Sequence, residues 1–427
     1  MERYLKFIKR LNYVLFLGLM ATLPLPRKYG HIMLIVWAVS WLLELRFTKR
    51  SNFCGWKKLF PALGLAVWVL WECLSLLWGG PQSGFRDCHA SLLILPLVVA
   101  FGVNEQYNWK QAAKALIISS LLSCFLYAFT LYWTSNVQHA WSCYCQEPYK
   151  PFQLIWFDIF LSNIKHRLFY CSILTVAIIC SWMLRKDYIQ RWGKVEGSIY
   201  LVLTLGILLT AIIATGSRAS LFTLIILCAV YGISLLPRHH RVWSIPLITL
   251  LMVGGSVAAW QLHPRMKNVT IDQILNPVEN IAEVDQQNPR GLIWHYALQT
   301  PKDYIGYGLG VCQAEQYLID RFEQEGWNRG VFDRFHAHNQ YLLICMELGI
   351  VAMLLFIAYW IYLPFCYPKK TKQRTFALCL AWLFGLNMLT DCLFSSIAGV
   401  VYICSLLVFL LTIPSSISEC HYPSANI

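Results

Sequence analysis

Apolar runs long enough to cross a lipid bilayer recur along almost the whole chain, from Leu11 to Ile413. A helix that crosses the hydrocarbon core needs about 20 mainly apolar residues. Twelve segments approach or meet this criterion: 11–26, 30–45, 60–79, 89–103, 112–134, 167–184, 197–215, 219–236, 244–262, 340–366, 375–393 and 396–413. Only 13% of the 427 residues are charged, about half the share in an ordinary soluble protein. The sequence therefore predicts an all-α polytopic membrane protein with about 12 transmembrane helices, and it excludes a soluble globule and a disordered chain.

The distribution of Lys and Arg sets the expected orientation, because cytoplasmic loops carry an excess of these residues. With the N-terminus inside, 21 of the 35 Lys and Arg fall on the inner side, together with six acidic residues. The formal charge of +13 therefore reports orientation rather than a nucleic-acid partner. We expect a multi-pass membrane protein with both termini in the cytoplasm.

This orientation leaves two long loops on the exported side, at about 135–166 and 263–337. The second holds ten acidic and seven basic residues and has the composition of a soluble domain. Loops of this length are usually functional rather than simple connectors. We therefore divide the chain into transmembrane helices 1–9 (residues 1–262), a partly helical exported loop domain (263–337), and transmembrane helices 10–12 with a short cytoplasmic tail (338–427).

Several chemistries lack their sequence signature. The chain contains no Gly-x-x-x-x-Gly-Lys-Ser/Thr loop for a nucleotide and no Cys/His spacing typical of zinc. The run Gly306-Tyr-Gly308-Leu-Gly310 fits a turn in the exported loop better than a dinucleotide site. We expect no metal, no cofactor and no nucleic acid, whereas the basic inner loops should contact anionic membrane lipids.

Arg218 lies in a very short connection, Ala214-Thr-Gly-Ser-Arg218, between two strongly apolar segments. It must therefore sit near the outer membrane surface, at or just before a helix start. The free N–H groups of a helix N-terminus favour anions, and a guanidinium beside them would complete a site for a phosphate at headgroup depth. The alternative is an Arg that reaches out to lipid phosphates without any specific role.

Arg290 follows Pro289, and the apolar residues after it predict a helix that starts here, inside the exported loop. A cation in the first turn of a helix faces an unfavourable dipole. Its presence makes sense if an anion binds nearby, although an ordinary surface Arg is the alternative.

His338 lies where the large loop re-enters the membrane, on the same side as Arg218. A histidine can accept or donate a proton near neutrality, and it could equally bind a phosphate. His336 and His338 could also share a metal, but no third ligand is evident from the sequence. For Glu347 and Asp391, two acidic residues within apolar spans, we favour structural roles.

These residues belong to a series of short motifs that occur in a fixed order. The series consists of Gly216-Ser-Arg218-Ala, Asn288-Pro-Arg290 with Trp294, Pro301 with Gly306-x-Gly308-x-Gly310, His336-x-His338-Asn339, and Glu347-x-Gly349-Ile350. It resembles the O-antigen ligase family over about residues 200–360. The same superfamily includes O-antigen polymerases and protein O-oligosaccharyltransferases.

The resemblance implies a glycosyltransferase of the bacterial inner membrane whose active site faces the periplasm. Its donor would be O-antigen polysaccharide on undecaprenyl diphosphate, and its acceptor a sugar hydroxyl of lipid A–core in lipopolysaccharide biosynthesis. The transfer would invert the anomeric configuration and need no metal. Family roles carry over to Arg218, Arg290 and His338, with Arg265 as a further residue that binds the diphosphate.

Two questions stay open at this point. His338 could be the general base for the acceptor or a ligand of the diphosphate. The chain could also be an O-antigen polymerase or, in a different functional class, a transporter or flippase of lipid-linked sugars.

Overall fold

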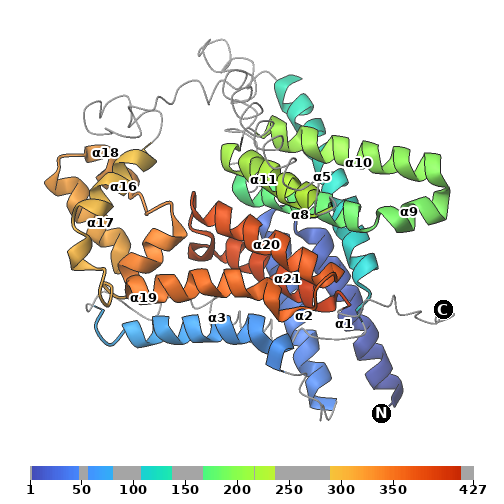
Figure 1. Cartoon of the computed structure of the whole chain (residues 1–427), viewed down its shortest axis with the longest axis horizontal. Helices are drawn as coiled ribbons and strands as arrows, with labels where there is room; N and C mark the ends of the chain where they lie inside the picture. Colours follow the sequence, from blue (N-terminus) through green and yellow to red (C-terminus); the bar gives the residue numbers. More distant parts are fainter. Residues whose placement is uncertain are drawn as a thin grey trace.

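The computed structural model describes residues 2–47, 56–79, 107–136, 167–215, 217–235 and 289–414. All regular structure in these ranges is helical, as the sequence predicts (Figure 1). The predicted spans 89–103 and 244–262 lie outside the described residues. The count of about 12 spans therefore stays a prediction.

The described helices are α1 (Glu2–Thr22), α2 (Arg27–Phe47), α3 (Trp56–Ser75), α5 (Trp109–Asn136), α8 (Arg167–Met183), α9 (Arg185–Trp192), α10 (Lys194–Ala214), α11 (Arg218–Leu235), α16 (Arg290–Gln299), α17 (Gln313–Gln324), α18 (Asn328–Asp333), α19 (Gln340–Tyr362), α20 (Lys372–Met388) and α21 (Ile397–Thr412). Short 3-10 turns η1 (Pro301–Asp303), η2 (Leu363–Cys366) and η3 (Leu393–Ser395) complete the set.

Three of the described helical segments are long and apolar enough to cross a membrane: Trp109–Phe129, Lys194–Ala214 and Gln340–Cys366. The pair α8 and α9 forms a fourth candidate, bent by 53° at the break between them. Leucine, valine and isoleucine side chains on α10 are more than half exposed, for example Val202 at 67% and Leu203 at 59%. Such surface suits contact with lipid, and the chain is a membrane protein.

The interior is formed mainly by α8, α19, α20 and α21. Consecutive residues of α21, from Ile403 to Leu410, are all fully or almost fully buried. In the same bundle α1 packs against α2 and α5, and α11 packs against α20. Figure 1 shows α3 and α19 side by side along one edge of this bundle, and the two helices are in contact.

The described part of the predicted loop domain, 289–337, is helical and packs around a hydrophobic core that it shares with the start of α19. This core includes Leu292 and Tyr296 of α16, Leu318 and Phe322 of α17, and Trp327 before α18. The three helices gather at one end of the molecule, drawn in yellow and light orange in Figure 1. The expectation of a partly helical loop is met within these residues.

The glycine-rich run 306–310 packs against a kink in α19. Gly349 interrupts the helix with φ 86° and ψ 172°, so Leu309 and Gly310 donate to the freed carbonyl oxygens of Met346 (2.8 Å) and Glu347 (2.9 Å). A Cβ on Gly349 would lie 2.1 Å from the Gly306 carbonyl oxygen. Only glycine permits this positive φ together with so close a backbone approach. The turn predicted here thus fastens the loop domain to α19.

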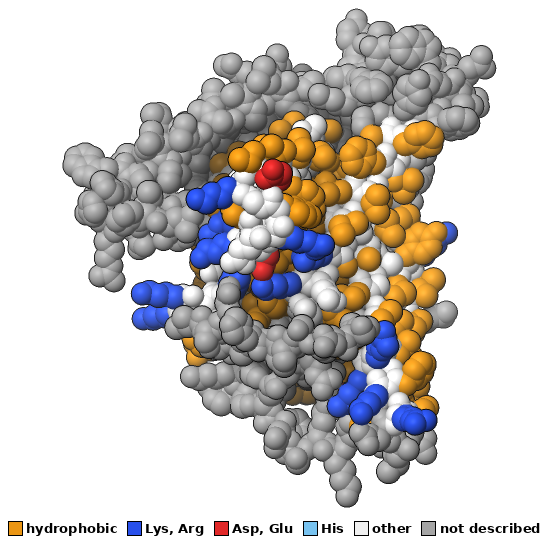
Figure 2. All heavy atoms as spheres, turned by 90° about the vertical axis from the view of Figure 1, so that its right-hand side faces the viewer, with side chains coloured by type: hydrophobic (Ala, Val, Ile, Leu, Met, Phe, Trp, Pro, Cys, Tyr) orange, Lys and Arg blue, Asp and Glu red, His pale blue; other side chains and the backbone are white. Residues whose placement is uncertain are grey.

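The opposite end of the molecule carries the positive charge. Figure 2 shows Lys and Arg side chains gathered on the face at the end where α9 lies, away from α16–α18. The basic residues Arg185, Lys186 and Arg191 of α9 belong to this end. The orientation expected from the sequence would place this end in the cytoplasm, and it stays a prediction.

Candidate functional site

Arg290 is the first residue of α16, with Pro289 at the N-cap, where the sequence predicts a helix start. Proline suits a helix start because its fixed φ matches the helix and it needs no donor there. Leu292 and Ile293, both fully buried, anchor the helix in the core of the loop domain. Arg290 therefore begins a helix that is firmly anchored in this core.

The segment containing His338 is fixed from both sides. Trp294 Nε1 of α16 donates to the Ala337 carbonyl oxygen at 2.9 Å. Asn339 caps α19, since its side chain accepts from the backbone N–H groups of Tyr341 and Leu342 at 3.0 and 3.1 Å. Residues from two of the sequence motifs therefore interlock directly around His338.

His338 itself adopts a left-handed backbone conformation with φ 45°. Its N–H donates to Nδ1 of His336 at 3.1 Å, and the two rings lie with centroids 3.9 Å apart. Non-glycine residues in this region cost energy and often occur at functional sites. The strain is held by the helix cap on one side and Trp294 on the other.

The third residue of the site is Asp391, three residues after the end of α20. Its Oδ1 lies 3.8 Å from His338 Nδ1. That nitrogen is buried and has no hydrogen-bond partner among the described residues. An orphaned imidazole nitrogen facing a carboxylate indicates a pair that tightens when the ring becomes protonated. The sequence analysis favoured a structural role for Asp391, whereas the structure places it beside the candidate catalytic histidine.

Arg290 and Asp391 are electrostatically coupled. Removal from water lowers the pKa of the Arg290 guanidinium, and the negative charge of Asp391 opposes that shift by raising it. Among the described residues, Arg290 forms no hydrogen bond and no ion pair within 4 Å, which leaves its donors available. A half-buried cation with open donors can bind an anion such as a phosphate.

The backbone start of α11 lies at the same end of the bundle. Arg218 is the first residue of α11. Five residues further along, Thr223 donates to Asn387 Oδ1 at 3.3 Å. Asn387 in turn donates to Ser172 at 2.7 Å, and its carbonyl oxygen accepts from the backbone N–H of Asp391 at 3.1 Å. The structure thus brings α11, which starts at Arg218, against α20, whose C-terminal end leads into Asp391.

Arg265, the fourth predicted site residue, lies outside the described residues. The signal that could have indicated Asp391 was in the sequence, because an acidic residue within an apolar span is functional by default. The sequence alone did not show that Asp391 faces His338.

A metal ion is geometrically possible at this site. One ligand atom each from His336, His338 and Asp391 lies within 4.8 Å of the others. The sequence analysis found no third ligand beside the two histidines, and Asp391 supplies one. Two imidazoles and a carboxylate are a donor set that zinc and other transition metals accept. The positive charge of Arg290 beside Asp391 opposes a bound dication, so the expectation of no metal stays a prediction.

An apolar groove of about 530 Å³ runs between α5, α8 and α10. Phe125, Val202 and Ile207 are among its lining residues, and it extends to Thr215. Thr215 precedes Arg218 by three residues, so one end of the groove lies next to the start of α11.

Residues 203–357 match the family of O-antigen ligases. This stretch contains Arg218, Arg290 and His338, whereas Asp391 lies beyond its end. No curated protein matches the chain. The match agrees with the resemblance of the sequence motifs, and it makes this stretch of the chain similar to the O-antigen ligases.

Proposed function

We propose that this protein is an O-antigen ligase, which transfers polysaccharide from undecaprenyl diphosphate to a sugar hydroxyl of lipid A–core. The observation that carries the proposal is the grouping of His338, Asp391 and Arg290 at one end of the helical bundle, where Arg290 has no ion-pair partner in the described part of the chain. A base paired with a carboxylate, together with a cation nearby, is what glycosyl transfer from a diphosphate donor needs.

The reaction is a displacement at the anomeric carbon. The acceptor oxygen forms a bond to that carbon while the bond to the diphosphate oxygen breaks, and the configuration is inverted. The hydroxyl proton passes to Nε2 of His338, and Asp391, on the Nδ1 side, stabilises the resulting imidazolium. Arg290, with Arg218, neutralises the charge that develops on the leaving diphosphate. Arg265 would contribute further positive charge.

The second role considered for His338 is a diphosphate ligand. The position of Asp391 favours the base, because a carboxylate 3.8 Å from Nδ1 stabilises a proton taken up by the ring and would repel a second anion bound to it.

The apolar groove supports a lipid-linked donor. A prenyl chain is a long hydrocarbon, and the groove between α5, α8 and α10 offers it apolar side chains along its length. Because one end lies at Thr215, a chain in the groove would bring its diphosphate towards the start of α11. The free N–H groups there favour an anion.

A deletion strain tests the proposal. Loss of a ligase should leave complete lipid A–core without O-antigen on a lipopolysaccharide gel, while polymer accumulates on its lipid carrier. If the core instead carries single O-antigen units, the protein is a polymerase and the ligase proposal fails.

A transporter or flippase would behave differently. It would move lipid-linked substrate across the membrane, and that movement would survive Arg290→Ala. Ligation that is lost in Arg290→Ala, with lipid-linked polymer still present on the periplasmic side, is the result we expect.

A further inference from the structure

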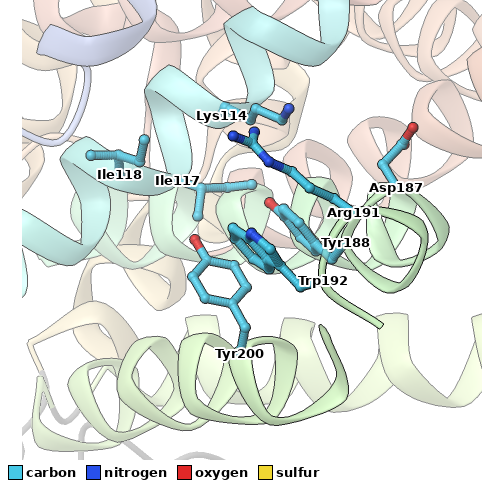
Figure 3. A pocket seen from close by; sticks show the side chains of 8 residues that line it. All are labelled: Lys114, Ile117, Ile118, Asp187, Tyr188, Arg191, Trp192 and Tyr200. Atoms are coloured by element: carbon cyan, nitrogen blue, oxygen red, sulfur yellow. The ribbon is translucent and has the colours of Figure 1, made fainter. Parts of the chain in front are cut away.

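A second concave site lies at the end of the molecule opposite to α16–α18. It is a pocket of about 150 Å³ between α5, α9 and α10 (Figure 3). None of its residues belongs to the site proposed for glycosyl transfer. Lys114 and Ile118 come from α5, Tyr188 and Arg191 from α9, and Tyr200 from α10. Three helices therefore meet at this pocket.

One wall of the pocket is aromatic. Tyr188 and Trp192 lie one helical turn apart on α9 and stack with ring centroids 5.7 Å apart and planes within 5°. Tyr200 meets both of them edge-on, at 5.0 and 4.6 Å (Figure 3). Tyr and Trp are enriched at the level of lipid headgroups, where one side of the ring is apolar and the other is wet. The wall has the chemistry of a membrane interface.

The rim of the pocket is positively charged. Asp187 also lines it, but this carboxylate accepts from Lys110 Nζ at 2.5 Å. Lys114 and Arg191 have no acidic partner among the described residues, and Figure 3 shows their cationic ends near one another above the aromatic wall. Two adjacent cations without counter-charge form a site for one anionic group.

An apolar stripe continues from the pocket along α5. Ile118, Leu122, Phe125 and Phe129 follow at helical spacing and are 53%, 62%, 59% and 62% exposed. Residues spaced by three or four share one face of a helix. A hydrocarbon chain that starts at the pocket can therefore lie along this face.

We propose that the pocket binds an anionic phospholipid of the cytoplasmic leaflet, with its phosphodiester between Lys114 and Arg191. The glycerol backbone rests on the aromatic wall, and an acyl chain follows the stripe on α5. Basic pockets between transmembrane helices on this side of a membrane bind anionic headgroups. The lipid would fasten α9 to α5 and α10, close to the 53° bend between α8 and α9.

Apart from Phe125, which also lines the apolar groove, this proposal shares no residue with the proposed function. It requires only that this end of the chain lie at headgroup level, which the basic face in Figure 2 supports. Lys186 provides a matched control. It is an exposed cation on the same short helix, yet it does not line the pocket.

The test uses the purified full-length protein in detergent with equimolar phosphatidylglycerol and phosphatidylethanolamine, and native mass spectrometry as the readout. We expect the wild type to retain phosphatidylglycerol preferentially. A cation near an anionic headgroup strengthens binding about fivefold, so Lys114→Gln with Arg191→Gln should weaken retention roughly 25-fold. Lys186→Gln should leave it unchanged.

Three results would overturn the proposal. The first is a wild-type protein that retains both lipids equally. This result does not depend on whether any variant folds. The second is an equal loss in Lys186→Gln, which would mean a general surface charge rather than a site. The third is thermal stabilisation by millimolar inorganic phosphate equal to that by phosphatidylglycerol, which would identify a free phosphate as the ligand.

Discussion

Replacing Asp391 by Asn tests how the site works, because it removes one charge and keeps the shape of the side chain. Asp391 is 7% exposed and faces His338 across 3.8 Å. If His338 takes the acceptor proton in the transition state, the imidazolium that forms loses its facing carboxylate in Asp391→Asn. The chemical step should slow, whereas the substrates should bind much as before.

The expected size follows from the distance. Two unit charges about 4 Å apart interact by about 4 kcal/mol at an effective dielectric constant of about 20. The nearby positive charge of Arg290 cancels part of this, because it also interacts with Asp391. We therefore expect a loss of about 2–4 kcal/mol, which corresponds to a fall in kcat of roughly 30- to 1000-fold.

The assay is ligation by purified protein in proteoliposomes, with kcat and the KM for the lipid-linked donor measured separately. Asp320→Asn makes the same chemical change on α17, where the carboxylate bonds only Gln316 among the described residues, and should leave both constants unchanged. A near-normal kcat in Asp391→Asn would refute the proposal that His338 acts as a general base paired with Asp391. A lowered KM for the donor with unchanged kcat would instead show His338 to be a diphosphate ligand, because the Asp391 carboxylate that repels the diphosphate would be gone.

Four further outcomes follow from the geometry. Arg290→Lys should lower ligation at least about 100-fold, since lysine cannot make the planar two-donor contact; near-normal ligation in membranes would refute that contact. Trp294→Phe removes the 2.9 Å hydrogen bond to Ala337, and thermal unfolding should show a loss of about 1–3 kcal/mol together with slower ligation. Gly349→Ala should lower the free energy of unfolding by about 2–4 kcal/mol, because it strains the backbone and displaces the loop. Gly306→Ala should be nearly neutral, since its Cβ would meet nothing within 4 Å. Equal effects of the two substitutions would contradict the role of the kink. Ligation should persist in EDTA, and loss that magnesium or zinc restores would assign the His336–His338–Asp391 cluster to a metal.

The parts of the site that the sequence predicted are those set by local structure. Arg290 follows a proline and begins a helix, and His338 precedes an asparagine that caps the next helix. Helix starts of this kind depend on a few neighbouring residues, so they can be recognised without the fold. The helical class followed in the same way from the length of the apolar runs.

The parts that the sequence could not predict depend on contacts between distant segments. Asp391 is an acidic residue in an apolar stretch, and only the packing of α20 against α19 reveals that it faces His338. From the sequence, Gly308 belongs to a turn and Gly349 is an isolated glycine in a helix. In the structure the two lie at the same kink of α19, because Gly310 donates to the Glu347 carbonyl oxygen that the kink leaves free. No local pattern specifies such a pairing.

The most direct test of the proposed function is ligation by the purified protein with two defined substrates, undecaprenyl-diphosphate O-antigen and lipid A–core. Gel analysis of the products would show which bond forms. We predict that polysaccharide appears on lipid A–core for the wild type and disappears in Arg290→Ala, a variant whose unfolding temperature should be checked in parallel. Longer polysaccharide on the lipid carrier, with lipid A–core left unmodified, would contradict the proposal.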